Sequence, residues 1–158
     1  MIKLVVVGKC KEKALISLVE EYEKRLRPYT KLSIIEVNDE QAPQSNSEAQ
    51  NTIVKQIEGE RILSKVKDQD YLILLDLKGT ELSSEAFSDK LENIRSYHSS
   101  DITFVIGGSL GLSEALIQRA NFRWKISDLT FTHQMVRVLI LEQIYRSYKI
   151  IHHEPYHK

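Results

Sequence analysis

The sequence has little cysteine and no long apolar run, and each shortage excludes a class of protein. Cys10 is the single cysteine among 158 residues, so an intrachain disulfide or a zinc site built on cysteines is impossible. No stretch approaches the roughly 18 consecutive apolar residues of a membrane span, and the run in MIKLVVVGK is too short for a signal peptide. We therefore expect a soluble, cytoplasmic protein that does not contact a membrane, with Cys10 as a small buried residue.

The sequence also lacks net charge, because Lys and Arg together number 22 and so do Asp and Glu. Net charge therefore gives no sign of a nucleic-acid partner, although it does not exclude one. The distribution is uneven: residues 1–31 hold eight basic and four acidic side chains, and residues 119–158 are again basic. A polyanion could meet both ends of the chain, or these charges could belong to solvated helix faces.

Apolar runs typical of strands alternate with helical patterns along the whole chain. Strands are predicted at residues 4–8, 31–37, 71–77, 102–106 and 123–127. Helices are predicted at residues 12–26, 47–66, 83–97, 113–120 and 133–151, with a turn at Lys78-Gly79 and a loop at residues 38–47. This alternation predicts an α/β fold with a mainly parallel sheet and flanking helices, in one domain of residues 1–158.

The last predicted helix is apolar around most of its circumference. The apolar residues are Met135, Val136, Val138, Leu139, Ile140, Leu141, Ile144, Tyr145, Tyr148 and Ile150. A helix of this kind must be buried on more than one side. We expect one side to pack on the sheet and another on a second subunit, which predicts a homodimer through this helix.

The segment FVIGGSLGL, residues 104–112, places a glycine-rich turn after a buried strand. It fits the G-x-S-x-G pattern of serine hydrolases, and Asp128 and His133 follow Ser109 in the order that such enzymes use. However, Asp128 and His133 are five residues apart before one helix, only 49 residues follow Ser109, and no HGGG-like oxyanion segment is present. A hydrolase triad is therefore not expected.

The standard phosphate-binding patterns fail as well. Gly107 and Gly108 are adjacent, whereas G-x-G-x-x-G separates its first two glycines, and no Gly-Lys-Ser/Thr is present. Ligands of parallel sheets bind outside the carboxyl ends of the strands. Three such ends are predicted at residues 75–76, 107–108 and 127–131, and an apolar slot for a flat adenine-like ring could come from Leu75, Ile126, Leu129 and Phe131. The alternative is that these are tight turns that only let helices pack on the sheet.

Several segments carry a resemblance to a known family. These are GKCKEK, YEKRLRPY, the Leu75-Asp76 strand end with Gly79, FVIGGSLGL, FTHQMVRVLILEQIYRSYKI and the closing YHK. In this order, and over the whole chain, they resemble the RlmH family of bacterial ribosomal RNA methyltransferases of the SPOUT class. The resemblance implies a C-terminal trefoil knot that binds S-adenosylmethionine, a homodimer, and methylation of N3 of a pseudouridine in 23S rRNA on the assembled ribosome.

The resemblance also implies roles for individual residues. Cofactor contacts are expected at the three strand ends, from Leu75, Gly107, Gly108, Ile126, Ser127, Asp128, Leu129, Thr130 and Phe131. Candidates for removing the N3 proton or stabilising charge on the base are His133, Arg137, Tyr156 and His157. RNA contacts are expected from Lys9, Lys11, Lys13, Arg25, Arg146 and Lys158, with Lys24 and Arg27 in the same basic N-terminal cluster.

Each of these candidates also has a structural explanation. His133 could cap its helix, Arg137 could pair with Glu142 or with an intersubunit carboxylate, and Arg146 lies four residues from Glu142. The tail HHEPYHK is expected to order over the substrate rather than to bind a metal through its histidines, since no cysteine supports a metal site and the family uses none.

Two positions depart from the family pattern. Thr132 stands where the family usually has proline before the last helix, and Leu110 replaces a residue that is often small or polar. Thr132 could itself cap the helix. These departures leave two alternatives open: a catalytically idle ribosome-binding or RNA-binding module, and a small-molecule methyltransferase.

Overall fold

A computed structural model describes residues 1–42, 44 and 47–158, so part of the expected loop at residues 38–47 lies outside the described residues. The described residues form one five-stranded parallel sheet with the strand order β2-β1-β4-β3-β5. The strands are β1 (Ile2–Val7), β2 (Leu32–Val37), β3 (Tyr71–Glu81), β4 (Ile102–Ile106) and β5 (Phe122–Lys125). The helices are α1 (Lys13–Leu26), α2 (Glu48–Leu63), α3 (Ser84–Tyr97), α4 (Glu114–Arg119) and α5 (His133–Ile151). The predicted α/β fold with a parallel sheet is confirmed.

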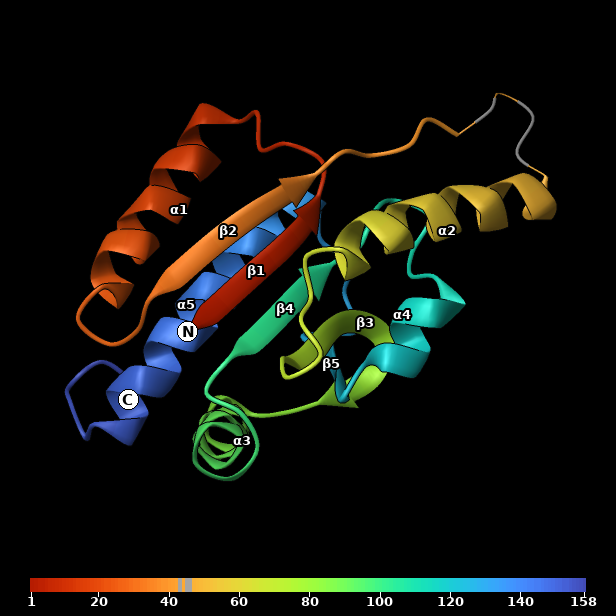
Figure 1. Cartoon of the computed structure of the whole chain (residues 1–158). Helices are drawn as coiled ribbons and strands as arrows, with labels where there is room; N and C mark the ends of the chain where they lie inside the picture. The colour runs from red at the N-terminus through yellow and green to blue at the C-terminus, as the bar shows by residue number, and fades with distance from the viewer. Residues whose placement is uncertain (43, 45–46) are drawn as a thin grey trace.

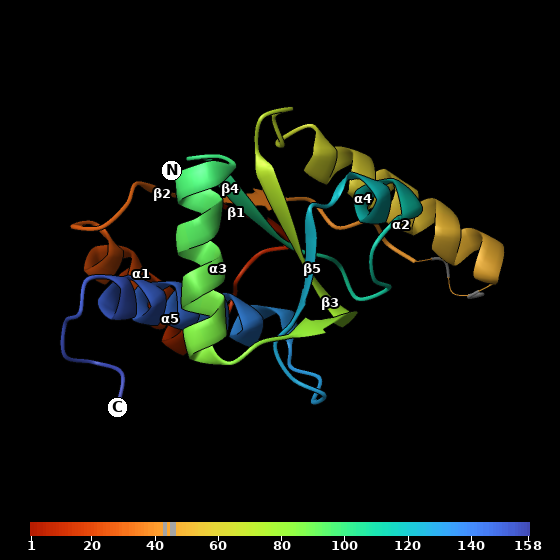
Figure 2. The same cartoon turned by 90° about the horizontal axis from the view of Figure 1, so that it is seen from below.

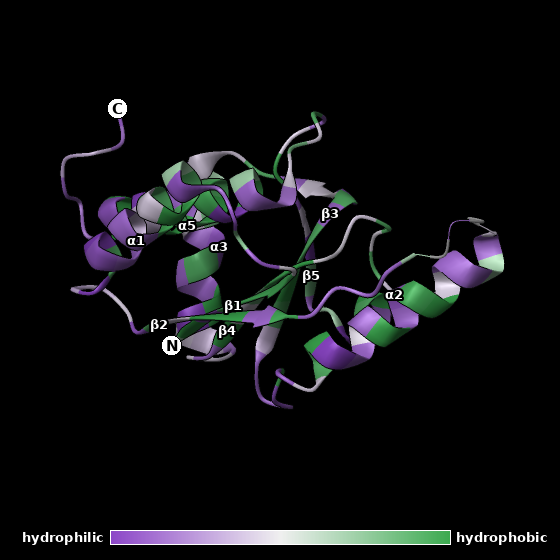
Figure 3. Cartoon of the chain, turned by 90° about the horizontal axis from the view of Figure 1, so that it is seen from above, coloured by the Kyte–Doolittle hydropathy of each residue, from purple (hydrophilic) through white to green (hydrophobic). Residues whose placement is uncertain are grey.

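The helices form two layers. Helices α1, α3 and α5 cover one face of the sheet, and α2 and α4 cover the other (Figures 1 and 2). Along β1, Leu4 and Val6 pack under the first layer, whereas Val5 and Val7 pack under the second. This two-sided burial explains why the central strands β1 and β4 are mostly apolar, and they are largely green in Figure 3.

Local capping signals set the starts of four helices. Ser47 caps α2 and forms a capping box with Gln50, while Ser83, Ser113 and Thr132 accept backbone N–H groups at the starts of α3, α4 and α5. The predicted capping box is confirmed. Because Thr132 caps α5, the alternative of His133 as the cap of this helix is wrong.

The predicted turn at Lys78-Gly79 is wrong, because β3 continues through these residues to Glu81. The register against β5 shifts between Leu75 and Thr80. A Cβ atom on Gly79 would lie only 2.5 Å from the carbonyl oxygen of Arg123 on β5. The glycine therefore allows a close approach of two strands rather than a reversal of the chain.

Helix α5 is buried on several sides within the single chain. Ile140, Leu141, Ile144 and Tyr148 are fully buried, and the helix packs against α1, α3 and β4. Its apolar circumference therefore needs no second subunit. Of its large apolar side chains among the described residues, Met135 is the exposed one, at 39%. The homodimer stays a prediction.

The trefoil knot also stays a prediction, because a knot depends on how the chain passes through its own loops, which the strand order does not describe. No helix in the described part of the chain is long and apolar enough to span a membrane.

Candidate functional site

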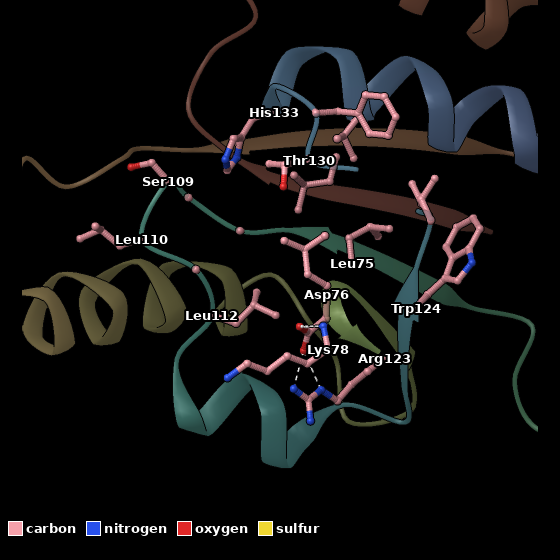
Figure 4. Close-up of a pocket in the computed structure, with 18 of the residues that line it drawn as sticks. Leu75, Asp76, Lys78, Ser109, Leu110, Leu112, Arg123, Trp124, Thr130 and His133 are labelled. Carbon is pink, nitrogen blue, oxygen red and sulfur yellow. Dashed lines mark hydrogen bonds and ion pairs between the residues drawn. The ribbon is translucent and has the colours of Figure 1, made fainter. Parts of the chain in front are cut away.

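A cavity of about 460 Å³ lies at the carboxyl ends of β4 and β5 and beside the middle of β3, at Leu75–Lys78, where the pairing with β4 has ended. Its size is typical of small-molecule sites, and its place is the one expected for ligands of parallel sheets. Three segments and the first turn of α5 form its walls (Figure 4). The main lining residues are Leu75, Asp76, Lys78, Ile106, Gly107, Gly108, Ser109, Leu110, Gly111, Leu112, Arg123, Ile126, Ser127, Leu129, Thr130, Phe131, His133 and Val136. The structure thus brings the three predicted segments together, but residues 75–76 lie within β3 and not at its end.

One side of this pocket carries charge. Asp76 accepts a hydrogen bond from the side chain of Arg123 at 2.6 Å and another from the backbone N–H of Lys78 at 2.9 Å (Figure 4). Lys55 and Lys78 also line the cavity. The remaining walls are largely apolar, with Leu75, Ile126 and Phe131 among them. A ligand with a flat apolar ring and a charged or polar end would match this distribution.

The glycine turn is shaped by packing beneath the pocket. The N–H of Gly111 donates to the carbonyl of Gly108 at 3.1 Å, and Gly111 has a φ of +102°, which favours glycine. A Cβ atom on Gly107 would lie 2.8 Å from Leu112, and one on Gly108 would collide with the carboxylate of Glu58. The space at these glycines is therefore needed by neighbouring protein atoms, whereas the sequence suggested that the ligand needs it.

Glu58 is a residue that the sequence gave no reason to select. It lies on α2, is buried, and accepts the backbone N–H of Glu40 at 3.0 Å through Oε2. Its Oε1 is buried without a hydrogen-bond partner in the described residues and faces Gly108. Burial raises the pKa of the carboxyl group above its ordinary value. Glu58 therefore supports the pocket turn from below.

A hydrolase triad does not form. Ser109 and His133 both line the pocket, but the Asp128 side chain is 87% exposed and binds Lys125 at 2.6 Å. This contact with Lys125 lowers the pKa of Asp128. Asp128 is also the one predicted cofactor residue that does not line the cavity, and its side chain points to β5 instead.

The β1–α1 connection, residues 8–12, runs beside α5. The side-chain oxygen of Gln134 accepts the backbone N–H groups of Lys11 and Glu12 at 3.0 and 3.1 Å. Cys10 lies in this connection with its Sγ 3.4 Å from the same oxygen. Its predicted burial in the core is wrong: it is half-buried, because the chain has already left the sheet at Gly8, where φ is +87°.

Arg137 points away from the pocket. Its guanidinium donates to Glu36 of β2 at 2.7 Å and to the carbonyl oxygen of Gly8 at 2.7 Å, and the residue is only 4% exposed. Glu142, the partner considered from the sequence, is not its partner here. Burial opposes ionisation of Glu36, but hydrogen bonds from Arg137 and the N–H of Cys10 outweigh it and lower its pKa.

The C-terminal tail packs on its own chain. The Tyr156 hydroxyl donates to Glu142 at 3.0 Å, and burial is the main cause that raises the pKa of this phenol. His157 lies 3.1 Å from Arg146 and 2.6 Å from Glu85. Glu142 is nine residues beyond His133, which places the tail about 13 Å or more along α5 from the pocket.

The predicted RNA-binding residues fall into two groups. Lys9, Lys11 and Lys13 are exposed near the carboxyl end of β1. Arg25 lies at the far end of α1, about 18 Å further along the helix axis, over the ring of Tyr145. Arg146 and Lys158 belong to this second group, with the tail. Arg146 binds Glu142 at 3.0 Å, as the four-residue spacing indicated.

No group of three or more His, Cys, Asp or Glu residues could hold a metal ion in the described ranges. The histidines of the tail are among these described residues.

Known proteins are similar to this chain over almost its whole length. The sequence model of a family described as predicted SPOUT methyltransferase matches residues 1–157. A protein of Clostridium botulinum strain 657 named ribosomal RNA large subunit methyltransferase H is 52% identical over 99% of each chain. One of Clostridium perfringens strain SM101, named ribosomal RNA large subunit methyltransferase H 1, is 50% identical over the same shares. The solved structure of a probable methylase family protein from Haemophilus influenzae is similar in fold, with a TM-score of 0.54 at 14% identity over 99% of this chain and 70% of that one.

Proposed function

Because the chain belongs to the RlmH family of SPOUT methyltransferases, we propose that it transfers a methyl group from S-adenosylmethionine to ribosomal RNA. The acceptor that we propose is N3 of a pseudouridine in 23S rRNA, on the assembled ribosome in the cytoplasm. The observation that carries this proposal is the 460 Å³ pocket at the ends of β4 and β5 and the middle of β3, in a chain similar over its full length to named rRNA methyltransferases.

The residues present fit this cofactor. Leu75, Ile126 and Phe131 provide apolar contact for an adenine ring, and residues 126–131 lie outside helices and strands, so their peptide groups are not used in a ladder. Further contacts are proposed from Gly107, Gly108, Ser127, Leu129 and Thr130, which also line the cavity. When bound, the cofactor supplies a methyl group already activated by its sulfonium, so the protein mainly has to orient the acceptor and accept one proton.

His133 is the residue that we propose for the acceptor side. It is the first residue of α5 and lines the pocket, and Thr132 caps the helix in its place. The imidazole can accept the N3 proton in its neutral form. The positive end of the α5 dipole favours the anion that remains on the base.

RNA binding is proposed for Lys9, Lys11 and Lys13, which lie near the first turn of α5, whose other face lines the pocket. Tyr156, His157, Arg146 and Lys158 belong to the far end of α5, so a direct contact between Tyr156 or His157 and the reacting base requires the pocket of a second subunit. We therefore keep the homodimer through α5 as part of the proposal.

The experiment that tests this proposal measures transfer of a tritiated methyl group from S-adenosylmethionine. Assembled ribosomes from a strain that lacks the modification are compared with free 23S rRNA and with a small-molecule extract. We expect incorporation into assembled ribosomes alone. Incorporation into the extract would instead indicate a small-molecule methyltransferase, and the absence of binding heat with S-adenosylmethionine in calorimetry would indicate an idle module.

A further inference from the structure

The first turn of α5 contacts two different parts of the protein. His133 and Val136 line the pocket, whereas Gln134 and Arg137 contact the β1–α1 connection. Residues three apart lie on the same side of a helix, so each pair forms one face. The same helical turn therefore sets the position of the pocket wall and of the connection.

Gln134 holds the residues that lead into α1. The N-cap residue of α1, Glu12, provides no side-chain cap. The Gln134 oxygen accepts the N–H groups of Lys11 and Glu12 at 3.0 and 3.1 Å and lies 3.4 Å from the Cys10 sulfur. One side-chain oxygen thus holds three consecutive residues.

Arg137 fixes the beginning of the same connection. It holds the Gly8 carbonyl at 2.7 Å and the Glu36 carboxylate at 2.7 Å, and Glu36 in turn accepts the N–H of Cys10 at 2.9 Å. Hydrogen bonds that involve charged groups are the stronger kind. The Arg137 side chain is buried, and its Nε has no hydrogen-bond partner in the described residues, so the guanidinium is turned into the protein and away from the surface.

The connection carries exposed lysines on a fixed backbone. Lys9, Lys11 and Lys13 are exposed, and none of their ammonium groups forms an ion pair with the residues that the structure describes. Holding the backbone in advance reduces the conformational entropy that RNA binding would otherwise cost. The side chains stay available for phosphates.

We propose that Gln134 and Arg137 are positioning residues, which hold Lys9 and Lys11 beside the pocket so that these lysines bind RNA phosphates next to the reacting base. This inference rests on the proposed function. It gives Arg137 a role different from the contact with the base that the sequence suggested.

The variant that tests the inference is Gln134→Ala. We expect the KM for ribosomes to rise about tenfold, while kcat and the affinity for S-adenosylmethionine change by less than about twofold, because the pocket-facing side of the turn is intact. Hydrogen exchange at the amides of Lys11 and Glu12 should become faster. Gln118→Ala, at an exposed position of α4 that does not line the pocket, is the matched control and should change none of these values.

A conservative variant separates positioning from direct action. Gln134→Glu keeps an oxygen that accepts the same N–H groups, so it should restore most of the ribosome KM and the slow amide exchange. If Gln134→Glu were as weak as Gln134→Ala although its amides exchanged slowly, the side-chain amide would act on the substrate directly and the inference would be wrong.

A double-mutant cycle gives the decisive result. In a Lys9→Ala/Lys11→Ala background, Gln134→Ala should raise the ribosome KM by less than about twofold, because the groups that it positions are already absent. A full tenfold effect in that background would overturn the inference. Absence of methyl transfer to ribosomes by the unmodified protein would instead contradict the proposed function, and the exchange measurement would still report whether Gln134 holds the connection.

Discussion

The two adjacent glycines of the pocket turn have no room for a side chain. The space beside Gly107 is filled by Leu112, and that beside Gly108 by Glu58. Both glycines also line the cavity. A side chain at either position must therefore displace Leu112 or Glu58, or move the turn, and both the turn and Leu112 line the proposed cofactor site. Ser109, in contrast, is exposed and can lose its hydroxyl group without such a displacement.

This difference predicts opposite results for neighbouring substitutions. Gly107→Leu should abolish the binding of S-adenosylmethionine in calorimetry, because the added side chain overlaps Leu112 and shifts the turn. Ser109→Ala should keep the affinity within about threefold and most of the methyl transfer, since the loss of one exposed hydroxyl group costs little. Circular dichroism checks that both variants fold. An inactive, folded Ser109→Ala protein would restore a chemical role for this serine.

A buried ion pair lies at the opposite end of the sheet. Lys3 binds Asp70 at 2.9 Å, and Thr103 donates to the same carboxylate oxygen at 2.9 Å. Burial opposes ionisation of Asp70, but these hydrogen bonds outweigh it, so its pKa in the folded protein is lowered. The stabilisation is therefore complete above the unfolded-state pKa of about 3.9 and is lost as the pH falls through the lower folded-state pKa.

Asp70→Asn should accordingly lower the free energy of unfolding by about 3 kcal/mol at pH 7, because Lys3 is left buried without its counter-ion. Urea unfolding at a series of pH values down to about 2 measures the difference, which should shrink towards the acid end. Asp68→Asn, at an exposed position nearby, is the control. A difference that stayed constant over this range would contradict the ionised state of Asp70.

At the scale of helices and strands, the chain shows which features a sequence can predict. The bounds of α4 and α5 follow from Ser113 and Thr132, whose capping contacts reach only three residues along the chain. The extension of β3 through Gly79 depends on the β5 backbone at Arg123, which no local pattern reveals. The strand ends of β4 and β5 at the site were predictable because parallel strands share one edge, whereas the expected end at residues 75–76 lies within β3.

The contacts of Arg137 show the opposite case. Its partners Glu36 and Gly8 lie 101 and 129 residues away, so neither spacing nor periodicity could identify them. The same holds for the packing of Gly108 on Glu58. Sequence reasoning therefore selected the strand ends of the pocket and missed the side chains that support them from other elements.

The C-terminal tail packs on α5, away from the pocket. Deletion of residues 156–158 should leave the affinity for S-adenosylmethionine within about twofold, because the tail does not line the pocket. Methyl transfer to ribosomes should fall by about 100-fold if Tyr156 and His157 contact the substrate as proposed. Calorimetry and tritium incorporation measure the two effects. Transfer at the full rate by the truncated protein would limit the tail to packing on α5.

The whole molecule is proposed to be a dimer, although α1 and α3 already cover much of α5. Sedimentation at micromolar concentration should give about twice the chain mass of 18.3 kDa. Met135→Glu should shift the protein towards the monomer, because this residue is the exposed apolar side chain of α5 in the described structure. Tyr97→Glu, exposed on α3, is the control. A monomer at every concentration would contradict the proposed dimer and, with it, any action of the tail on a partner's substrate.

The most direct test of the proposed function is nucleoside mass spectrometry of 23S rRNA from cells that lack the native methyltransferase and express this chain. We predict the appearance of 3-methylpseudouridine at one position with the unmodified chain, and its absence with Gly107→Leu. An rRNA that gained no methyl group from the folded, cofactor-binding protein, or that gained it on a different atom, would contradict the proposal.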